Sequence, residues 1–218
     1  MATLKLGSTN AITESSGALT YAQAGGLKSM QVFETAGTFT GASGWQRPTG
    51  ITTIKVYVTG AGGGAMSNAQ ANKLSGAAGG TAIEIIDVTS ITSVDFTIGA
   101  GSTGTVYNND IGRGGSSSFG SHCSATGGLG GYTWAGSDGG LGAGGDINLR
   151  GQGGMILGNL DDQGCSGGSS FWGGGARGSE DTGDSVLEEG IHGGGGGASD
   201  TASTNNGGTG IIVVEEYS

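Results

Sequence analysis

The sequence has few of the residues from which a hydrophobic core is usually built. Leu, Ile, Val and Phe together make 39 of the 218 residues, a share below the roughly 20 % that an ordinary core needs. Proline occurs once and glycine follows no strict triplet repeat, which excludes a collagen triple helix. No run approaches 18 apolar residues and no signal-peptide pattern opens the chain, so neither a transmembrane helix nor secretion is expected.

Basic residues and cysteines are also scarce. Eight Lys and Arg stand against 18 Asp and Glu, for a formal net charge of −10. Such a chain is repelled by phosphate backbones and anionic bilayers, which disfavours sequence-blind nucleic-acid binding. Cys123 and Cys165 are the only cysteines and form no CxxC pair. We expect free thiols made in a reducing cytoplasm, with a disulfide between the two as the alternative.

Glycine is what the chain has in excess: 53 residues, of which 45 lie after residue 59. They form tracts separated by chemically varied stretches of similar length, a quasi-repeat that a flexible Gly/Ser linker does not show. The tracts are Gly62–Gly64, Gly79–Gly80, Gly127–Gly131, Gly139–Gly145, Gly151–Gly154, Gly173–Gly175 and Gly193–Gly197.

A few β-branched segments read as strands, and no stretch has a helical period. They are Ile54–Thr59, Ala82–Val88, Val94–Ile98 and Ile211–Tyr217, with a turn at Thr89–Thr92. We expect them to form a small β frame in which the last strand pairs near the first.

The tracts have no side chains to bury, and ordering each residue opposes folding by about 1–2 kcal/mol. One way to order them is the polyglycine II helix, with 3 residues per turn and its N–H and C=O groups pointing outward to neighbouring rods. The expected fold class is therefore all-β and irregular: a small β frame plus a polyglycine II sandwich, with variable loops at one end.

If the tracts run up and down, their connectors alternate between two ends. One set is long and irregular: Ala65–Ser75, Ser102–Ile111, Tyr132–Asp138, Met155–Cys165 and Ser179–His192. The other set is compact: Ser116–Ser121, Asp146–Arg150 and Ser169–Trp172. Irregular loops on a rigid scaffold usually bind something.

The ordered series of motifs resembles the glycine-rich domain of bacteriophage tail-fibre proteins. It includes GGTAIEIIDV, VDFTIGAGSTG, GRGGSSSFGS, GAGGDINLRGQGG, GGSSFWGGGARG and GGTGIIVVEEY, and is similar over roughly residues 37–218 to the adhesins that cap the long tail fibres of T-even-type phages. The resemblance implies a polyglycine II sandwich whose variable segments contact a bacterial surface receptor. The opening, MATLKLGSTNAITESSG, resembles the start of structural proteins in other tailed phages and departs from the T-even adhesins.

From these patterns we expect residues 1–44 to attach or oligomerise the chain and residues 45–218 to form the glycine-rich receptor-binding domain. The expected partners are a host outer-membrane protein or glycan and other tail proteins, in a homotrimer or a monomer capping a trimeric fibre of the virion. Aromatic and apolar loop residues are the candidate receptor contacts. They are Met66, Tyr107, Tyr132, Trp134, Met155, Ile156, Leu157, Leu160, Val186 and Leu187.

No catalytic constellation is present, so neither an enzyme nor a cofactor is expected. His122 adjoins Cys123, but no spacing matches a zinc site, and His192 lies far away. The acidic residues 161–162 and 180–189 match no EF-hand, so a solvated or receptor-facing rim is favoured over calcium. Phe119, Phe171 and Trp172 fit packing at the base of the array, where Arg150 would bond Asp146 or free carbonyls.

Two other classes of function remain open. One is a purely structural fibre joint or decoration protein of the virion, which would not need five irregular loops. The other is an ice-binding protein, which can use polyglycine II rods but would show a stricter triplet period and a flat face.

Overall fold

The computed structural model describes residues 3–6, 9–15, 18–21, 26–67, 72–106, 112–131, 137–158, 164–178, 189–198 and 205–218. Within these ranges the chain forms β-strands, a single-turn 3₁₀ helix at Gly41–Ser43 and long extended segments. None of the described segments is a helix long and apolar enough to cross a bilayer. The expectation of an all-β, irregular fold is confirmed.

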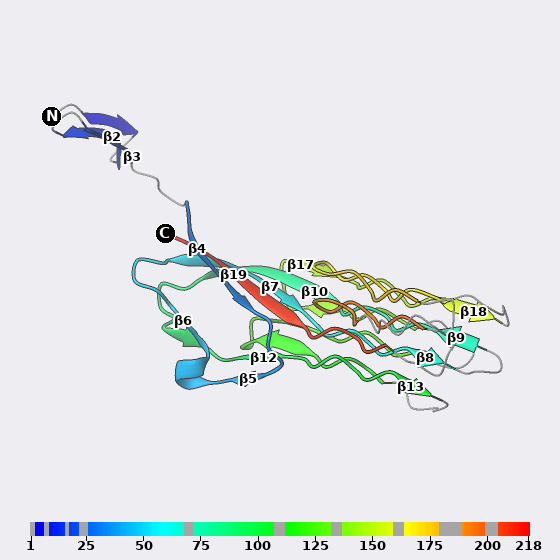
Figure 1. The fold of residues 1–218 in the computed structure, drawn as a ribbon. Coiled ribbons are helices and arrows are strands. Elements are labelled where there is room, and N and C mark those ends of the chain that lie inside the picture. The colour runs from blue at the N-terminus through cyan, green and yellow to red at the C-terminus, as the bar shows by residue number, and fades with distance from the viewer. Residues whose placement is uncertain are drawn as a thin grey trace.

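An antiparallel five-stranded sheet is the main part of the β frame (Figure 1). Its order is β17 (Ile147–Leu149), β10 (Thr81–Asp87), β7 (Thr53–Thr59), β19 (Ile211–Tyr217) and β4 (Leu27–Phe33). The last strand therefore pairs with the first expected one, as the sequence indicated: Ile211 lies opposite Thr59 and Tyr217 opposite Thr53.

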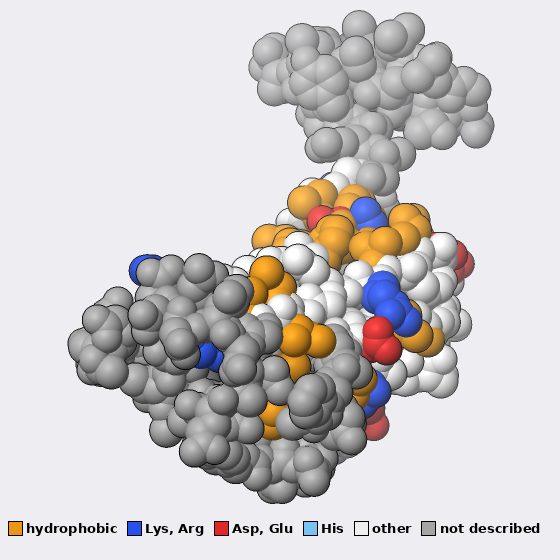
Figure 2. Space-filling view, turned by 90° about the vertical axis from the view of Figure 1, so that its right-hand side faces the viewer, with side chains coloured by type: hydrophobic (Ala, Val, Ile, Leu, Met, Phe, Trp, Pro, Cys, Tyr) orange, Lys and Arg blue, Asp and Glu red, His pale blue; other side chains and the backbone are white. Residues whose placement is uncertain are grey.

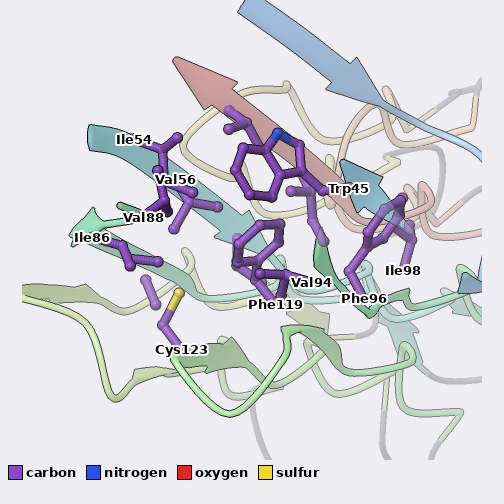
Figure 3. Packing of buried hydrophobic residues seen from close by; sticks show 14 of the residues in the cluster. Trp45, Ile54, Val56, Ile86, Val88, Val94, Phe96, Ile98, Phe119 and Cys123 are labelled. Carbon is purple, nitrogen blue, oxygen red and sulfur yellow. The ribbon is translucent and has the colours of Figure 1, made fainter. Parts of the chain in front are cut away.

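A second five-stranded sheet covers one face of the first. Its order is β16 (Gly142–Ala143), β15 (Cys123–Ala125), β14 (Ser117–Phe119), β12 (Phe96–Ile98) and β5 (Gly37–Phe39). A short pair, β6 (Trp45–Gln46) and β11 (Ser93–Val94), lies beside it. Figure 3 shows the core between the sheets, where Trp45 and Phe119 are fully buried and their ring centroids are 6.1 Å apart.

A buried carboxylate closes this core on β19. Glu216 has no exposed surface, and its Oε1 accepts hydrogen bonds from Trp45 Nε1 (2.9 Å) and Gln31 Nε2 (2.7 Å). Ser29 Oγ donates to the other oxygen. The donors come from β4 and β6, so Glu216 joins both strands to the sheet.

Residues before position 45 contribute strands to the same structure. β4 pairs with β19, and β5 pairs with β12. The expected domain boundary between residues 44 and 45 is thus crossed by both of these strand pairings. Farther towards the N-terminus, β1 (Thr3–Leu6), β2 (Thr9–Ser15) and β3 (Ala18–Tyr21) form a three-stranded antiparallel sheet.

The glycine tracts extend from the frame as parallel and antiparallel rods (Figure 1). Along residues 60–65 each backbone N–H donates to a different neighbouring tract from the residue before it. The three partner tracts are 75–80, 112–115 and 205–210, and the order repeats after three residues. The backbone bonds are Gly60 N to Gly80 O (3.0 Å), Ala61 N to Gly115 O (3.0 Å), Gly62 N to Gly208 O (2.9 Å), Gly63 N to Ala77 O (2.9 Å) and Ala65 N to Asn205 O (3.0 Å).

The next rod, residues 75–80, has the same period. Its neighbours are the tracts 151–155, 193–196 and 126–129. The bonds are Ser75 N to Met155 O (3.1 Å), Gly76 N to Gly196 O (2.8 Å), Ala77 N to Leu129 O (2.8 Å), Ala78 N to Gln152 O (2.9 Å), Gly79 N to Gly193 O (2.9 Å) and Gly80 N to Thr126 O (3.1 Å). Three bonding directions that repeat every three residues are the arrangement of a polyglycine II array.

The rods lie closer together than side chains allow. A Cβ added to Gly76 would lie 1.9 Å from Gly63 O, and one added to Gly62 would lie 1.9 Å from Gly194 O. Conformation is not the reason for glycine here, because φ is not positive at these residues. The described glycines with positive φ are Gly37, Gly41, Gly50, Gly120, Gly144 and Gly193. Backbone hydrogen bonds between rods therefore take the place of a side-chain core.

Candidate functional site

The compact connectors and three of the irregular connectors lie at opposite ends of the rods. Two of the compact stretches contain frame strands, β14 and β17, and the third stacks on the sheet, with the Tyr57 and Phe171 ring centroids 6.0 Å apart. The irregular connectors 65–75, 102–111 and 155–165 carry the short strands β8, β9, β13 and β18, which lie at the other end (Figure 1). We call this end the tip.

Three of the irregular connectors are joined at the tip by a four-stranded sheet of order β13-β8-β9-β18. Its strands are β8 (Met66–Ser67), β9 (Asn72–Leu74), β13 (Thr105–Val106) and β18 (Ile156–Gly158). Met66 is paired with both Leu74 and Thr105, and Ile156 is paired with Leu74. Loops far apart in the sequence thus form one surface.

Side chains under the tip sheet form a small apolar cluster. Ala65, Cys165 and Ala198 are buried together, and Leu157 packs against them. A bridge between Cys165 and Ala198 joins two rods at this point. The tip therefore has packing of its own in addition to the rod bonds, which fixes the strands that display the loops.

The structure separates the described candidates by exposure. Met155 and Ile156 are exposed, at 51 % and 41 %, whereas Met66 is only 1 % exposed and Leu157 is partly buried. Met66 is thus not the surface residue we expected, because its pairing with β9 and β13 encloses it. The other candidates fall outside the described residues. They are Tyr107, Tyr132, Trp134, Leu160, Val186 and Leu187.

Two further features, one at each end of the rods, were missed in the sequence. Ala198 and Asn205, the described residues that flank positions 199–204, bond to Cys165 and Ala65 respectively, so this short Ser/Thr-rich stretch begins and ends at the tip. His192, by contrast, lies at the frame end. Its φ of 45°, the positive φ of Gly193 and the Gly194 N to Ile191 O bond form a tight two-residue turn.

At the frame end, one contact expected from the sequence is wrong. Arg150 bonds Asp138 Oδ1 (3.2 Å) and not Asp146, whose Oδ2 instead accepts the Ile85 N–H (3.0 Å). Phe119 is buried as expected. Phe171 and Trp172 pack on Tyr57, outside the sheet, and are themselves 50 % and 38 % exposed.

A family model for a glycine-rich domain matches residues 35–217. The chain belongs to this glycine-rich domain family. A search of curated proteins finds no match. The matched range begins just after β4 and ends with the last residue of β19, so it includes the rods, the tip and the frame apart from β4.

The described part of the glycine-rich domain shows little grouping of reactive side chains. It contains no cluster of three His, Cys, Asp or Glu residues that could hold a metal ion. A cavity of about 430 Å³ is lined in part by His192, Glu189 and Asn206, and the side chains of the last two bond each other (3.0 Å).

Both cysteines are free and buried. Burial raises the pKa of the Cys123 thiol to about 12, with the carboxylate of Glu84 adding to the effect. Burial also raises the pKa of Cys165, although hydrogen bonds from Ser75 and Ala198 oppose it. We expect iodoacetamide at pH 8 to leave both thiols of the folded domain unmodified and to modify both in urea, read by mass spectrometry. Rapid modification without urea would contradict the burial.

The raised pKa of Cys123 also makes the stability of the fold depend on pH. A thiol whose folded pKa exceeds its unfolded value of about 8.5–9 stabilises the fold below pH 9, and that stability is lost as pH rises towards 12. We expect the free energy of unfolding to fall by about 1 kcal/mol between pH 8 and pH 10 from this group. Urea titrations at both pH values should show a smaller fall in Cys123→Ala, whereas an equal fall would assign the effect to other groups.

Proposed function

We propose that this glycine-rich domain is the adhesin of a bacteriophage tail fibre or tail tip and recognises a bacterial surface receptor. The proposal rests on the separation of irregular and compact connectors to opposite ends of the rods. Irregular loops meet in one sheet at the tip, while the compact turns lie at the frame. A scaffold that holds unlike loops side by side at one end is the usual architecture of a binding surface.

The rods suit this role because their backbone bonds do not depend on the exposed side chains of the loops. Each rod bonds through its backbone to several others, so an exposed loop residue can change without removing these bonds. A tip with exposed Met155 and Ile156 presents apolar contact area of the kind that interfaces use. Several copies displayed on one virion would raise the overall affinity by multivalency.

The partner that fits is a protein or glycan of the bacterial outer surface. With a net charge of −10, the domain would meet an acidic envelope with repulsion that salt screens. Binding would then depend on shape and apolar contacts at the tip. Within the virion the chain would act as a homotrimer or as a monomer that caps a trimeric fibre.

The proposal is tested by retention of the domain on a panel of bacterial outer-membrane preparations. We expect the double variant Met155→Ser, Ile156→Ser to bind at least about tenfold more weakly, because it removes the exposed apolar contacts of the tip. The matched control is Ile85→Ser, since Ile85 is 61 % exposed but lies on the frame strand β10. Circular dichroism checks that all variants fold.

Equal retention of the wild-type domain and the tip variant would contradict the proposal. Two further changes, replacement of the Met155–Leu160 segment by Gly and Ser and Trp134→Ala, extend the same test to the rest of this loop and to a second loop. If none of these changes alters adsorption, a structural joint or decoration role in the virion becomes the better interpretation.

A further inference from the structure

The strand β4 leaves one side of the five-stranded sheet open. It is the last strand in the order β17-β10-β7-β19-β4, and its described partner is β19 alone. Three of its apolar residues are exposed: Leu27 at 55 %, Met30 at 57 % and Val32 at 46 %. An edge strand of seven residues presents unpaired backbone N–H and C=O groups, which can pair with a further strand.

The register places these three residues on the outer face of the sheet. Leu27, Met30 and Val32 lie opposite Tyr217, Glu215 and Val213, whereas the alternate residues Ser29 and Gln31 reach Glu216 on the inner face. The outer face continues as one apolar cross-strand row over all five strands. The row consists of Val32, Val213, Tyr57, Ile83 and Ile147.

The side-chain content of β4 also favours an approach by another chain. The strand contains no acidic residue, no proline and one basic residue, Lys28, in a protein whose net charge is −10. Natural edge strands usually carry charges or proline that prevent pairing. Figure 2, which looks along the rods, shows hydrophobic side chains on the body of the molecule, with Lys, Arg, Asp and Glu side chains between them.

We propose that two copies of the chain pair through their β4 strands, antiparallel and about a two-fold axis perpendicular to the sheet. An axis at Met30 gives the largest overlap, because Met30 is the middle residue of Leu27–Phe33. Met30 then faces Met30, and Ser29 faces Gln31 on the inner face. No like charges meet, and the symmetry keeps the apolar outer faces of both sheets on one side.

A second copy fits this edge because the strand is complementary to itself, and antiparallel self-pairing satisfies the same backbone groups on both chains at once. The contact lies at the frame, away from the tip sheet, so it joins two domains without using the loops. The inference concerns assembly and its test needs no receptor. The pair is an alternative to the homotrimer and to the single capping chain of the proposed function, and the mass measured below distinguishes the three.

Disulfide trapping tests the register. Directly opposed residues of antiparallel strands have Cα atoms about 4.5–5.5 Å apart, within the range of a disulfide. We expect Met30→Cys in the full chain to form a covalent dimer under mild oxidation, seen on a non-reducing gel. The matched control is Ile147→Cys, which is 52 % exposed on the opposite edge strand β17 and should stay monomeric. The native cysteines are buried and add little background.

Light scattering at micromolar concentration gives the second measurement. The wild-type chain should have about twice the monomer mass of 21.0 kDa, and Met30→Glu should restore the monomer because it places two carboxylates opposite each other. Ile85→Glu, an equally exposed outer-face change away from the edge, should leave the dimer intact. A monomeric wild-type chain, a trimer insensitive to Met30→Glu, or trapping through Ile147→Cys alone would each overturn the proposal.

Discussion

Replacing Gly76 by alanine should lower the free energy of unfolding by at least about 3 kcal/mol. The added Cβ would lie 1.9 Å from Gly63 O and 3.0 Å from Gly64 O, both backbone atoms of the neighbouring rod. No rotamer change can relieve such a contact, so the rods must separate and weaken bonds such as Gly63 N to Ala77 O. For a chain of this length the loss corresponds to a fall in Tm of roughly 6–12 °C.

Two controls distinguish the effect of a steric clash from the effect of a changed amino-acid composition. Gly174 also lies in a glycine tract, but a Cβ there meets nothing within 4 Å, so Gly174→Ala should change stability by less than about 0.5 kcal/mol. Exchanging Gly76 and Ala77 keeps the composition and should destabilise the protein as much as Gly76→Ala alone. Thermal and urea unfolding measure all three variants. Equal stability of Gly76→Ala and Gly174→Ala would show that the rods do not pack as described.

Glu216→Ala is the second change with a large expected effect, a loss of about 3 kcal/mol in the free energy of unfolding. The substitution removes the acceptor for Trp45 Nε1, Gln31 Nε2 and Ser29 Oγ. Trp45 is fully buried, so its N–H would lose its partner without gaining water, and an unsatisfied buried donor destabilises by about 1–3 kcal/mol. Because β4 and β6 supply the donors, both strands should loosen.

A double-mutant cycle with Trp45→Phe assigns the effect to the hydrogen bond. If the indole N–H and the carboxylate stabilise each other, the double variant should lose less stability than the sum of the two single variants. Glu215→Ala is the comparison on the outer face, where Glu215 is only partly buried, and it should have a smaller effect. Additive losses in the cycle would mean that Glu216 acts through packing and not through Trp45.

The β-strands and the rods could be predicted because each depends on a local pattern. The β-branched segments 54–59, 82–88 and 211–217 became β7, β10 and β19 with bounds shifted by about one residue. The tracts predicted polyglycine II because a run without side chains has few other ordered states. The three-residue alternation of partners along 60–65 then follows from three residues per turn.

The strand β4 and the enclosure of Met66 could not be predicted in this way. The sequence LKSMQVF does not alternate clearly between apolar and polar residues. Its pairing with β19 includes a register shift, and the polar residues of its inner face bond a carboxylate from the far end of the chain. Met66 looked like an exposed loop residue. It is buried because β9, from the same connector, and β13, from another connector, flank it.

The sequence by itself determined how this fold is stabilised. It has too few apolar side chains for an ordinary core, and its glycine tracts have a backbone that can bond in three directions. Only the tertiary structure decided which tract lies against which, because every glycine rod offers the same N–H and C=O groups and nothing in the sequence distinguishes one neighbour from another. That choice brought three separate loops into one sheet at the tip and left β4 open at the edge of the frame.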